Sequence, residues 1–311
     1  DAVTALKIAT AEDTYLDATD FTYLKGLPNL TYLDFEDADC INGTQKHCIP
    51  DQAMGTWGGK NDKPASTSLR TVILSRKVDT MNSAAFYNCT NLEGEIIIPK
   101  NIKTMWWYLF ANTKVSKITF EAGSEVKAIC EGAFANMQNL EAVNIPDTVT
   151  EIGNYAFKNC PNLKGNYGDG TLYLPASLKT LAHQSFMNTG IKRVIFNENV
   201  SSLGGYDFSN CPLEGTLYIP GNVKTTALQE FDGCNKVTAL LLNEGTETLG
   251  QLAFRMFGLH TIYLPSTIKT VHRDAFGDVN KYVQDAIFYL ADEAVKSKLS
   301  NGNNNVYLVD K

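Results

Sequence analysis

Short segments in which apolar and polar residues alternate recur along most of the chain, usually 22 to 24 residues apart. Such alternation is the pattern of a short β-strand with one buried face. Proline follows five of these segments, and it ends a strand because it has no backbone N–H to donate. The segments lie at 72–74, 96–98, 118–120, 143–145, 172–174, 194–196, 217–219, 240–242, 262–264 and 288–290.

A phenylalanine marks the second half of each repeat. Successive phenylalanines are 22 to 24 residues apart except for one step of 29, which contains the glycine-rich stretch GNYGDG at 165–170 and is typical of a loop insertion. Apolar residues about four apart around each phenylalanine predict a short helical turn packed on the strand. The phenylalanines are Phe86, Phe110, Phe134, Phe157, Phe186, Phe208, Phe231, Phe254 and Phe276.

This periodicity predicts an α/β repeat solenoid in which each repeat, or rung, buries its apolar side against the next. The period lies in the range of leucine-rich repeats. We expect a right-handed array of about 11–12 rungs, with short strands on one face and short helical turns on the other. The predicted organisation is an N-terminal cap or divergent first repeat (1–36), a loop insertion (37–68), the solenoid (69–290) and a C-terminal cap (291–311).

Six of the seven cysteines fall into two groups. Cys89, Cys160, Cys211 and Cys234 each follow a phenylalanine by three residues, in a position that holds Thr or Met in other repeats, so we expect buried, unreactive thiols. Cys40 and Cys48 lie eight residues apart in a polar stretch outside the repeats. They form a disulfide or remain two free thiols, and the spacing does not decide between these alternatives.

Charge and composition narrow the range of functions. The chain carries 27 basic and 34 acidic residues and a net charge of −7, which argues against binding to nucleic acids and anionic membranes. No apolar run approaches the roughly 18 residues of a membrane span. The four histidines occupy unrelated places in the period, and Cys40, His47 and Cys48 match no usual zinc spacing. We therefore expect no enzyme, no metal site and no cofactor.

The best candidate site is formed by the middle residue of each strand, because its inward-pointing neighbours turn it toward the solvent. Most of these residues are apolar or aromatic. A contiguous exposed apolar stripe is typical of a binding surface, but a ladder of such residues also stabilises neighbouring strands. Both interpretations are open. The candidates are Tyr173, Ile195, Tyr218, Leu241, Tyr263 and Tyr289.

Three tryptophans are secondary candidates. Trp57 lies in the glycine-rich part of the predicted insertion, either as an exposed contact residue or packed inward over the first rungs. Trp106 and Trp107 occupy positions where other repeats have polar residues, and at least one of them is expected to be exposed.

The pattern I-P-x-x-V-x-x-I-x-x-x-A-F-x-x-C-x-x-L, at Ile145 to Leu163, resembles the BspA-type leucine-rich repeat of bacterial surface proteins, notably those of Bacteroides and relatives. The resemblance covers about residues 69 to 290, and the closing FYLADEAVKSKLSNGNNNVYLVD is similar to the family's C-terminal cap. It implies export and exposure at the cell surface and, in some members, adhesion to host proteins, with no catalytic motif to transfer.

Two hypotheses follow. The first is a non-enzymatic, exported cell-surface protein that binds a protein or glycan partner through its strand face, with the partner's identity and the oligomeric state open. The alternative is a structural or spacer module of a larger surface protein with no ligand of its own. The chain begins at Asp1 without a basic and apolar leader. Either a targeting segment was removed or the numbering starts at an arbitrary boundary, and the sequence does not decide between these alternatives.

Overall fold

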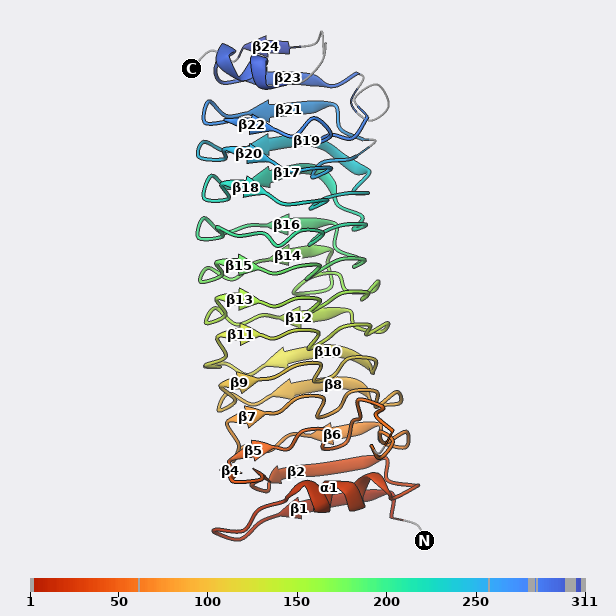
Figure 1. Cartoon of the computed structure of the whole chain (residues 1–311). Helices are drawn as coiled ribbons and strands as arrows, with labels where there is room; N and C mark the ends of the chain where they lie inside the picture. Colours follow the sequence, from red (N-terminus) through yellow and green to blue (C-terminus); the bar gives the residue numbers. More distant parts are fainter. Residues whose placement is uncertain are drawn as a thin grey trace. The chain divides into compact units, whose positions relative to one another are not determined.

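The protein is a parallel β-solenoid of about 12 turns, which confirms the predicted leucine-rich-repeat fold. The structure, a computed structural model, describes residues 3–60, 62–256, 258–278, 283, 285–299 and, for the backbone alone, 306–308 (Figure 1). It divides into two compact units, Asp1–Leu163 and Lys164–Lys311. This division falls inside the region predicted as one solenoid.

In the first unit, the strands of the main face form two parallel sheets, one of the first three strands and one of the last three, and pair in register within each sheet. Val72 lies opposite Leu33, and Ile118 lies opposite both Ile96 and Val143, so the buried residue of each strand meets that of the next. The strands are β1 (Ala5–Ala9), β2 (Tyr32–Asp37), β6 (Thr71–Ile73), β8 (Glu93–Ile98), β10 (Lys114–Phe120) and β12 (Ala142–Asn144).

The second unit repeats this arrangement. Leu172 lies opposite Val194, and Leu240 lies opposite both Leu217 and Ile262. Its main-face strands are β14 (Thr171–Tyr173), β16 (Arg193–Ile195), β17 (Glu214–Ile219), β19 (Lys236–Leu242), β21 (Thr261–Leu264), β23 (Ile287–Leu290) and β24 (Val306–Leu308).

A second column of two-residue strands runs along another side of each unit. In the first unit it consists of β5 (Cys48–Ile49), β7 (Thr80–Met81), β9 (Thr104–Met105), β11 (Ala128–Ile129) and β13 (Glu151–Ile152). In the second unit it consists of β15 (Thr180–Leu181), β18 (Thr225–Thr226), β20 (Thr248–Leu249) and β22 (Thr270–Val271).

The segments around the phenylalanines are not helical, which corrects the predicted helical turns. The residues two before and two after most of these phenylalanines have positive φ, for example Ala84 at 57° and Asn88 at 64° around Phe86. This left-handed conformation interrupts the helical hydrogen-bond pattern. The backbone N–H groups bond instead to the next rung: that of Phe86 donates to the carbonyl of Leu109 at 2.9 Å.

The phenylalanines themselves stack through the core as expected. Centroids of consecutive rings lie 5.1–6.1 Å apart in the first unit and 5.6–5.9 Å apart in the second. Each ring is at most 4% exposed, and burying one such side chain contributes roughly 1.5–3 kcal/mol. The stacks run from Phe86 to Phe157 and from Phe186 to Phe276.

Four cysteines complete these layers, and their predicted burial is confirmed. The thiol of Cys160 donates to the carbonyl of Phe134 at 3.1 Å, and that of Cys234 donates to the carbonyl of Phe208 at 3.1 Å. Cys89 and Cys211 make the same kind of bond to Met54 and Phe186. Burial raises the pKa of Cys89 and Cys160 to about 12 and that of Cys211 to about 11, so these thiols stay protonated.

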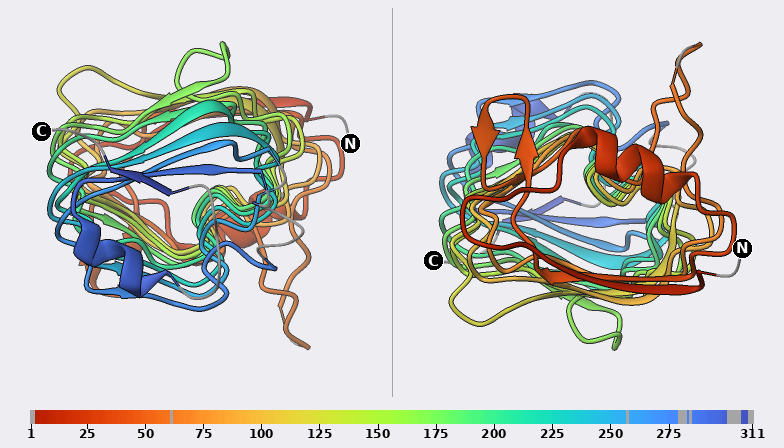
Figure 2. Two further views of the ribbon diagram at one scale, coloured as in Figure 1. Left: turned by 90° about the horizontal axis from the view of Figure 1, so that it is seen from above. Right: turned by 90° about the horizontal axis from the view of Figure 1, so that it is seen from below.

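Helix α1 (Ala18–Lys25) closes the N-terminal end of the first unit. It begins with a capping box, because the Asp17 carboxylate accepts the backbone N–H of Asp20 at 3.0 Å while the Asp20 carboxylate accepts that of Asp17 at 2.9 Å. Phe21 is buried against Phe35, and Figure 2 shows α1 on the opposite side of the first rung from β1.

Residues 37–68 are more ordered than the loop insertion that the sequence predicts. They contain a hairpin of β3 (Ile41–Asn42) and β4 (Gln45–Lys46), followed by β5, which pairs with β7. The backbone of Met54 and Gly55 then donates to the carbonyl of Ala85, as the phenylalanine segments of other rungs do. This stretch therefore supplies the second half of the rung that begins at β2.

The predicted C-terminal cap contains a 3₁₀-helix, η1 (Glu293–Lys298), and the last strand, β24. Asp292 caps η1 by accepting the backbone N–H of Ala294 at 2.8 Å, and Val295 packs into the core. The backbone of β24 pairs with β23. The remaining residues of this predicted cap, 300–305 and 309–311, lie outside the described part of the chain.

Two carboxyl groups lie in the core of the second unit, one residue before the stacked phenylalanines, where most other rungs have Ala or Leu. Asp207 accepts hydrogen bonds from the backbone N–H groups of Ser185 (3.1 Å) and Gly204 (2.8 Å), and Glu230 accepts one from Gly205 (3.1 Å). Both are fully buried. Burial raises the pKa of Asp207 to about 6, and burial together with the Asp207 charge raises the pKa of Glu230 well above its usual value.

We predict that Glu230→Gln stabilises the protein at neutral pH. The folded state retains protons that the unfolded chain releases, so stability is greatest below the unfolded pKa values and decreases as pH rises through about 6. A neutral Gln keeps the shape and removes the cost of holding this carboxyl protonated above its unfolded pKa. The melting temperature at pH 7.5 should rise by about 2–6 °C, and its decrease between pH 4 and 8 should become shallower.

The matched control is Glu247→Gln in the same unit. Lys269 lowers the pKa of this exposed carboxylate, so its loss should leave the melting temperature nearly unchanged or slightly lower at pH 7.5. An unchanged pH slope in Glu230→Gln, with a lower melting temperature, would contradict the prediction.

Candidate functional site

The candidate site is a column of side chains on the main-face strands of the second unit, which we call the strand-face ladder. Its inward-pointing neighbours, such as Leu240 and Leu242, are buried, which directs the ladder residues outward. Exposure is 47% for Tyr173, 48% for Ile195, 37% for Leu241 and 36% for Tyr263. The ladder consists of Tyr173, Ile195, Tyr218, Leu241, Tyr263 and Tyr289, the last of these and Tyr218 being half-buried.

Strand register brings the ladder residues side by side. Tyr173 lies opposite Ile195 on β14 and β16, and Leu241 lies opposite both Tyr218 and Tyr263. Tyr263 and Tyr289 are also paired, and their rings stack with centroids 4.7 Å apart and planes 13° apart. The apolar surface is therefore built from two runs of paired positions, Tyr173 with Ile195 on one sheet and Tyr218 to Tyr289 on the other.

Tyr167 extends the ladder beyond the residues that the sequence indicates. It lies in the glycine-rich insertion, is 78% exposed, and has its ring centroid 6.3 Å from that of Tyr173. The insertion is held close because the Asn166 side chain accepts the backbone N–H of Tyr173 at 2.7 Å. The aromatic residue inside GNYGDG is the sequence feature that could have indicated this extension. The repeat period, however, gives no information about the face on which an insertion lies.

Polar groups border the ladder. The hydroxyl of Tyr218 donates to Glu198 at 3.2 Å and accepts from the Asn243 amide at 2.8 Å. Burial, followed by the Glu198 carboxylate, raises the pKa of Tyr218, so its hydroxyl is protonated at neutral pH. On the other side, the Arg193 guanidinium donates to the Thr171 hydroxyl at 3.0 Å. An apolar stripe bordered by polar groups is the usual composition of a recognition surface.

The corresponding positions in the first unit have a different character. Lys7 and Asp34 form an ion pair at 3.4 Å. The Asn144 amide turns to the backbone, accepting the N–H of Phe120 at 2.7 Å and donating to its carbonyl at 3.0 Å. Ile97, at 48% exposed, and the half-buried Ile73 of the preceding rung are the large apolar residues of this column. The longer apolar column therefore belongs to the second unit.

The tryptophans lie in the first unit. Trp57 is both packed and exposed: its ring contacts Tyr87 and Tyr108, with centroid distances of 5.3 and 5.4 Å, yet it remains 42% exposed. Trp106 and Trp107 pack edge to face against each other and are 41% and 49% exposed, as expected for at least one of them. None of the three belongs to the strand-face ladder.

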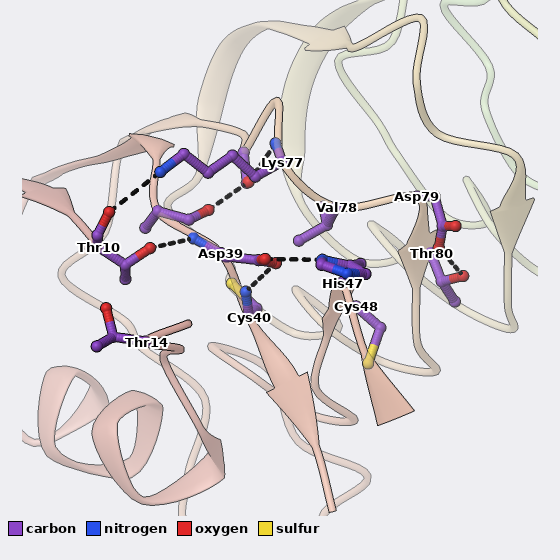
Figure 3. Close-up of polar contacts among 12 residues, drawn as sticks. Thr10, Thr14, Asp39, Cys40, His47, Cys48, Lys77, Val78, Asp79 and Thr80 are labelled. Carbon is purple, nitrogen blue, oxygen red and sulfur yellow. Dashed lines mark hydrogen bonds and ion pairs between the residues drawn. The ribbon is translucent and has the colours of Figure 1, made fainter. Parts of the chain in front are cut away.

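Cys40 and Cys48 lie at the base of the β3–β4 hairpin, and both are free, buried thiols. The Cys48 thiol donates to the carbonyl of Gln45 at 2.9 Å. His47 bonds to the Asp39 carboxylate at 2.7 Å, as Figure 3 shows. No bond joins these two sulfurs here, and a disulfide between Cys40 and Cys48 stays a prediction. Among the described residues, no group of three or more His, Cys, Asp or Glu side chains could hold a metal ion.

The chemistry available on the ladder is that of binding. Its aromatic rings and aliphatic side chains offer apolar contact, and the tyrosine hydroxyl and neighbouring amides offer hydrogen bonds. The perturbed carboxyl pair Asp207 and Glu230 is fully buried, so it is inaccessible to a substrate.

The sequence matches the BspA type leucine-rich repeat region in six copies, over residues 64–167 and 170–283. These segments make up well over half of the chain, and the protein therefore belongs to the BspA-type leucine-rich repeat family. No curated protein matches the sequence.

Solved structures of bacterial leucine-rich repeat proteins are similar to this chain, and the first of them supports the fold. A leucine-rich repeat protein from Bacteroides ovatus is similar with a TM-score of 0.55 and 16% identity, over 99% of this chain and 92% of that one. A leucine-rich repeat protein from Eubacterium ventriosum has a TM-score of 0.48 and 16% identity, over 92% and 79%. A leucine-rich cell surface protein from Faecalibacterium prausnitzii has a TM-score of 0.44 and 17% identity, over 88% and 86%.

Among the described residues, no helix combines the length and the apolar character needed to cross a bilayer.

We predict that Gly132→Ala displaces Tyr108. Gly132 has φ of 59°, and a Cβ there would lie 2.3 Å from the Tyr108 ring. Stability should decrease by about 1–2 kcal/mol for the left-handed backbone, and the near-UV circular dichroism should change as Tyr108 moves relative to Trp57.

Gly123→Ala is the matched control, because Gly123 has φ of 82° with no atom within 4 Å of its added Cβ. It should lose similar stability with an unchanged near-UV spectrum. Identical spectra for both variants would contradict the predicted displacement.

Proposed function

We propose that this protein is a non-enzymatic cell-surface protein that binds a protein or glycan partner through the strand-face ladder. The observation that carries the proposal is the length of the apolar column in the second unit. The equivalent column of the first unit, which has the same fold, holds two large apolar residues, Ile73 and Ile97. A column needed only for strand pairing would be expected in both, yet the first unit has an ion pair and an amide turned to the backbone at these positions. Exposed contiguous apolar surface marks interaction sites.

Membership in the BspA-type family supports export and exposure at the cell surface, because the family resemblance implies both. The leucine-rich repeat fold supports a binding role rather than catalysis. The acidic net charge of −7 favours a partner other than a nucleic acid. A partner could place aromatic or aliphatic groups on the ladder and form hydrogen bonds with its border, where Arg193 and Glu198 lie.

A spacer module with no ligand is the second candidate. The stacking of Tyr263 on Tyr289 favours it, because contacts between neighbouring strands stabilise a sheet by about 0.2–1 kcal/mol per pair. In that case the ladder serves the fold alone, and removing it should reduce stability without affecting binding.

We predict that Ile195→Ser and Tyr173→Ser/Tyr263→Ser weaken binding to the partner at least tenfold, because each removes an exposed apolar contact from the ladder. The purified protein would first be screened against immobilised host matrix proteins and glycans, and the affinities for any hit would then be measured. Melting temperatures should stay within a few degrees of the parent.

Ile97→Ser is the matched control, because Ile97 has the same exposure of 48% at the equivalent strand position of the first unit. It should bind as the parent does. Equal affinity for Ile97→Ser and Ile195→Ser would overturn the ladder as the recognition surface. If the screen gives no hit and the tyrosine variant has a much lower melting temperature than the parent, the spacer module is favoured.

A further inference from the structure

The first unit contains all three tryptophans of the chain, and each is between 41% and 49% exposed. Tryptophan is usually highly buried on average, so this degree of exposure calls for an explanation. Packing accounts for part of the Trp57 ring but leaves the rest in contact with solvent.

Trp57 is one member of a cluster of three rings, which we call the aromatic platform: Trp57, Tyr87 and Tyr108. The Tyr87 and Tyr108 centroids lie 5.8 Å apart, and Trp57 is within 5.4 Å of both. The rings come from three different rungs. Tyr87 directly follows Phe86, and Tyr108 lies two residues before Phe110. Trp57 follows the segment whose backbone donates to the carbonyl of Ala85. Each ring is in contact with the other two, so the cluster is arranged before any ligand arrives.

The backbone beneath the platform is also fixed. The Gln52 side chain accepts the backbone N–H of Trp57 at 2.9 Å. Lys25 of helix α1 donates to the carbonyls of Gln52 (2.9 Å) and Gly55 (3.2 Å). Gly132, which lacks a side chain, leaves room for the Tyr108 ring. Rigid Trp and Tyr side chains bind at a low cost in conformational entropy.

Polar groups lie at the edge of the platform. The hydroxyl of Tyr108 donates to the Glu131 carboxylate at 3.0 Å, which leaves that carboxylate able to accept further hydrogen bonds. Burial, followed by the hydrogen bond to Glu131, raises the pKa of Tyr108 to about 12, so the hydroxyl keeps its proton. An exposed indole ring, two half-buried tyrosine rings, a hydroxyl and a hydrogen-bond acceptor are thus combined on one small area.

We propose that the aromatic platform is a second binding site, separate from the strand-face ladder, and that it binds a neutral polysaccharide. Sugar rings have apolar C–H faces that pack on aromatic rings, and hydroxyl groups at their edges that donate to a carboxylate such as Glu131. A carboxylate at the edge disfavours anionic polysaccharides through charge repulsion. The site is an open surface, which suits a chain that extends beyond it in both directions.

The experiment uses the full chain and four soluble neutral polysaccharides: a β-glucan, an α-glucan, a mannan and a xylan. Binding is measured by affinity gel electrophoresis and by the shift in tryptophan fluorescence, which reports on the first unit alone because it holds every tryptophan. At least one polysaccharide should retard the parent and change its fluorescence. Trp57→Ala should reduce the affinity measured from that retardation at least tenfold.

Two further variants make the result specific. Tyr23→Ala removes a tyrosine that is 71% exposed on helix α1, outside the platform, and should bind as the parent does. Glu131→Gln keeps the side-chain shape and the platform rings, and should weaken binding through loss of the charged acceptor. Its melting temperature should remain near that of the parent, which separates loss of binding from unfolding.

The proposal would be overturned if none of the four polysaccharides retarded the parent, or if Trp57→Ala and Tyr23→Ala bound equally well. Ile195→Ser, which alters only the strand-face ladder, should retain polysaccharide binding. Loss of binding in Ile195→Ser with retention in Trp57→Ala would assign the polysaccharide to the ladder and reject the platform.

Discussion

The backbone hydrogen bonds that pass from one rung to the next are the interaction on which the rest of the structure depends. Strands form these bonds on the main face, and the left-handed segments around the phenylalanines form them on another side, as when the N–H of Phe110 donates to the carbonyl of Ala133 at 2.9 Å. A buried backbone group without a partner costs free energy comparable to a lost hydrogen bond. No rung can satisfy these groups by itself, so stability arises from nearest-neighbour contacts.

This constraint also aligns the side chains. Because consecutive rungs bond in register, every position in the repeat becomes a column through its unit, and the chemistry of a column depends on what each rung contributes. The phenylalanine column is uniform and provides the core. The outward column is mostly polar in the first unit, where Ile73 and Ile97 are exceptions, and apolar in the second. This difference is the basis for a binding role of the second unit's face.

The sequence predicts the repeat, the strands and the buried phenylalanines because these follow a strict period. It does not predict the segments around the phenylalanines, since apolar residues four apart suit a helix equally well. The informative signal was Asn two residues after most phenylalanines, as at Asn88, Asn112 and Asn136. Asn adopts positive φ more readily than most residues, and its recurrence at one position indicates a left-handed backbone.

The candidate sites were predictable to different degrees. Alternation alone places the ladder residues outward, and their exposure agrees with it. Tyr167 and the contacts of Trp57 depend on how two insertions fold, and an insertion has no period to follow. Asn144 is exposed, as alternation predicts, and its amide also bonds to the backbone of Phe120 in the preceding rung. Alternation predicts the exposure of such a residue but gives no information about this contact between rungs.

The buried cysteines give each unit its own internal reporter. Their sulfurs are enclosed between rungs, Cys89 and Cys160 in the first unit and Cys211 and Cys234 in the second. A thiol reagent can reach such a sulfur only when neighbouring rungs separate, so the rate of modification measures the free energy of local opening. The local stability along this protein is therefore accessible to chemical labelling, unit by unit, without the introduction of any probe.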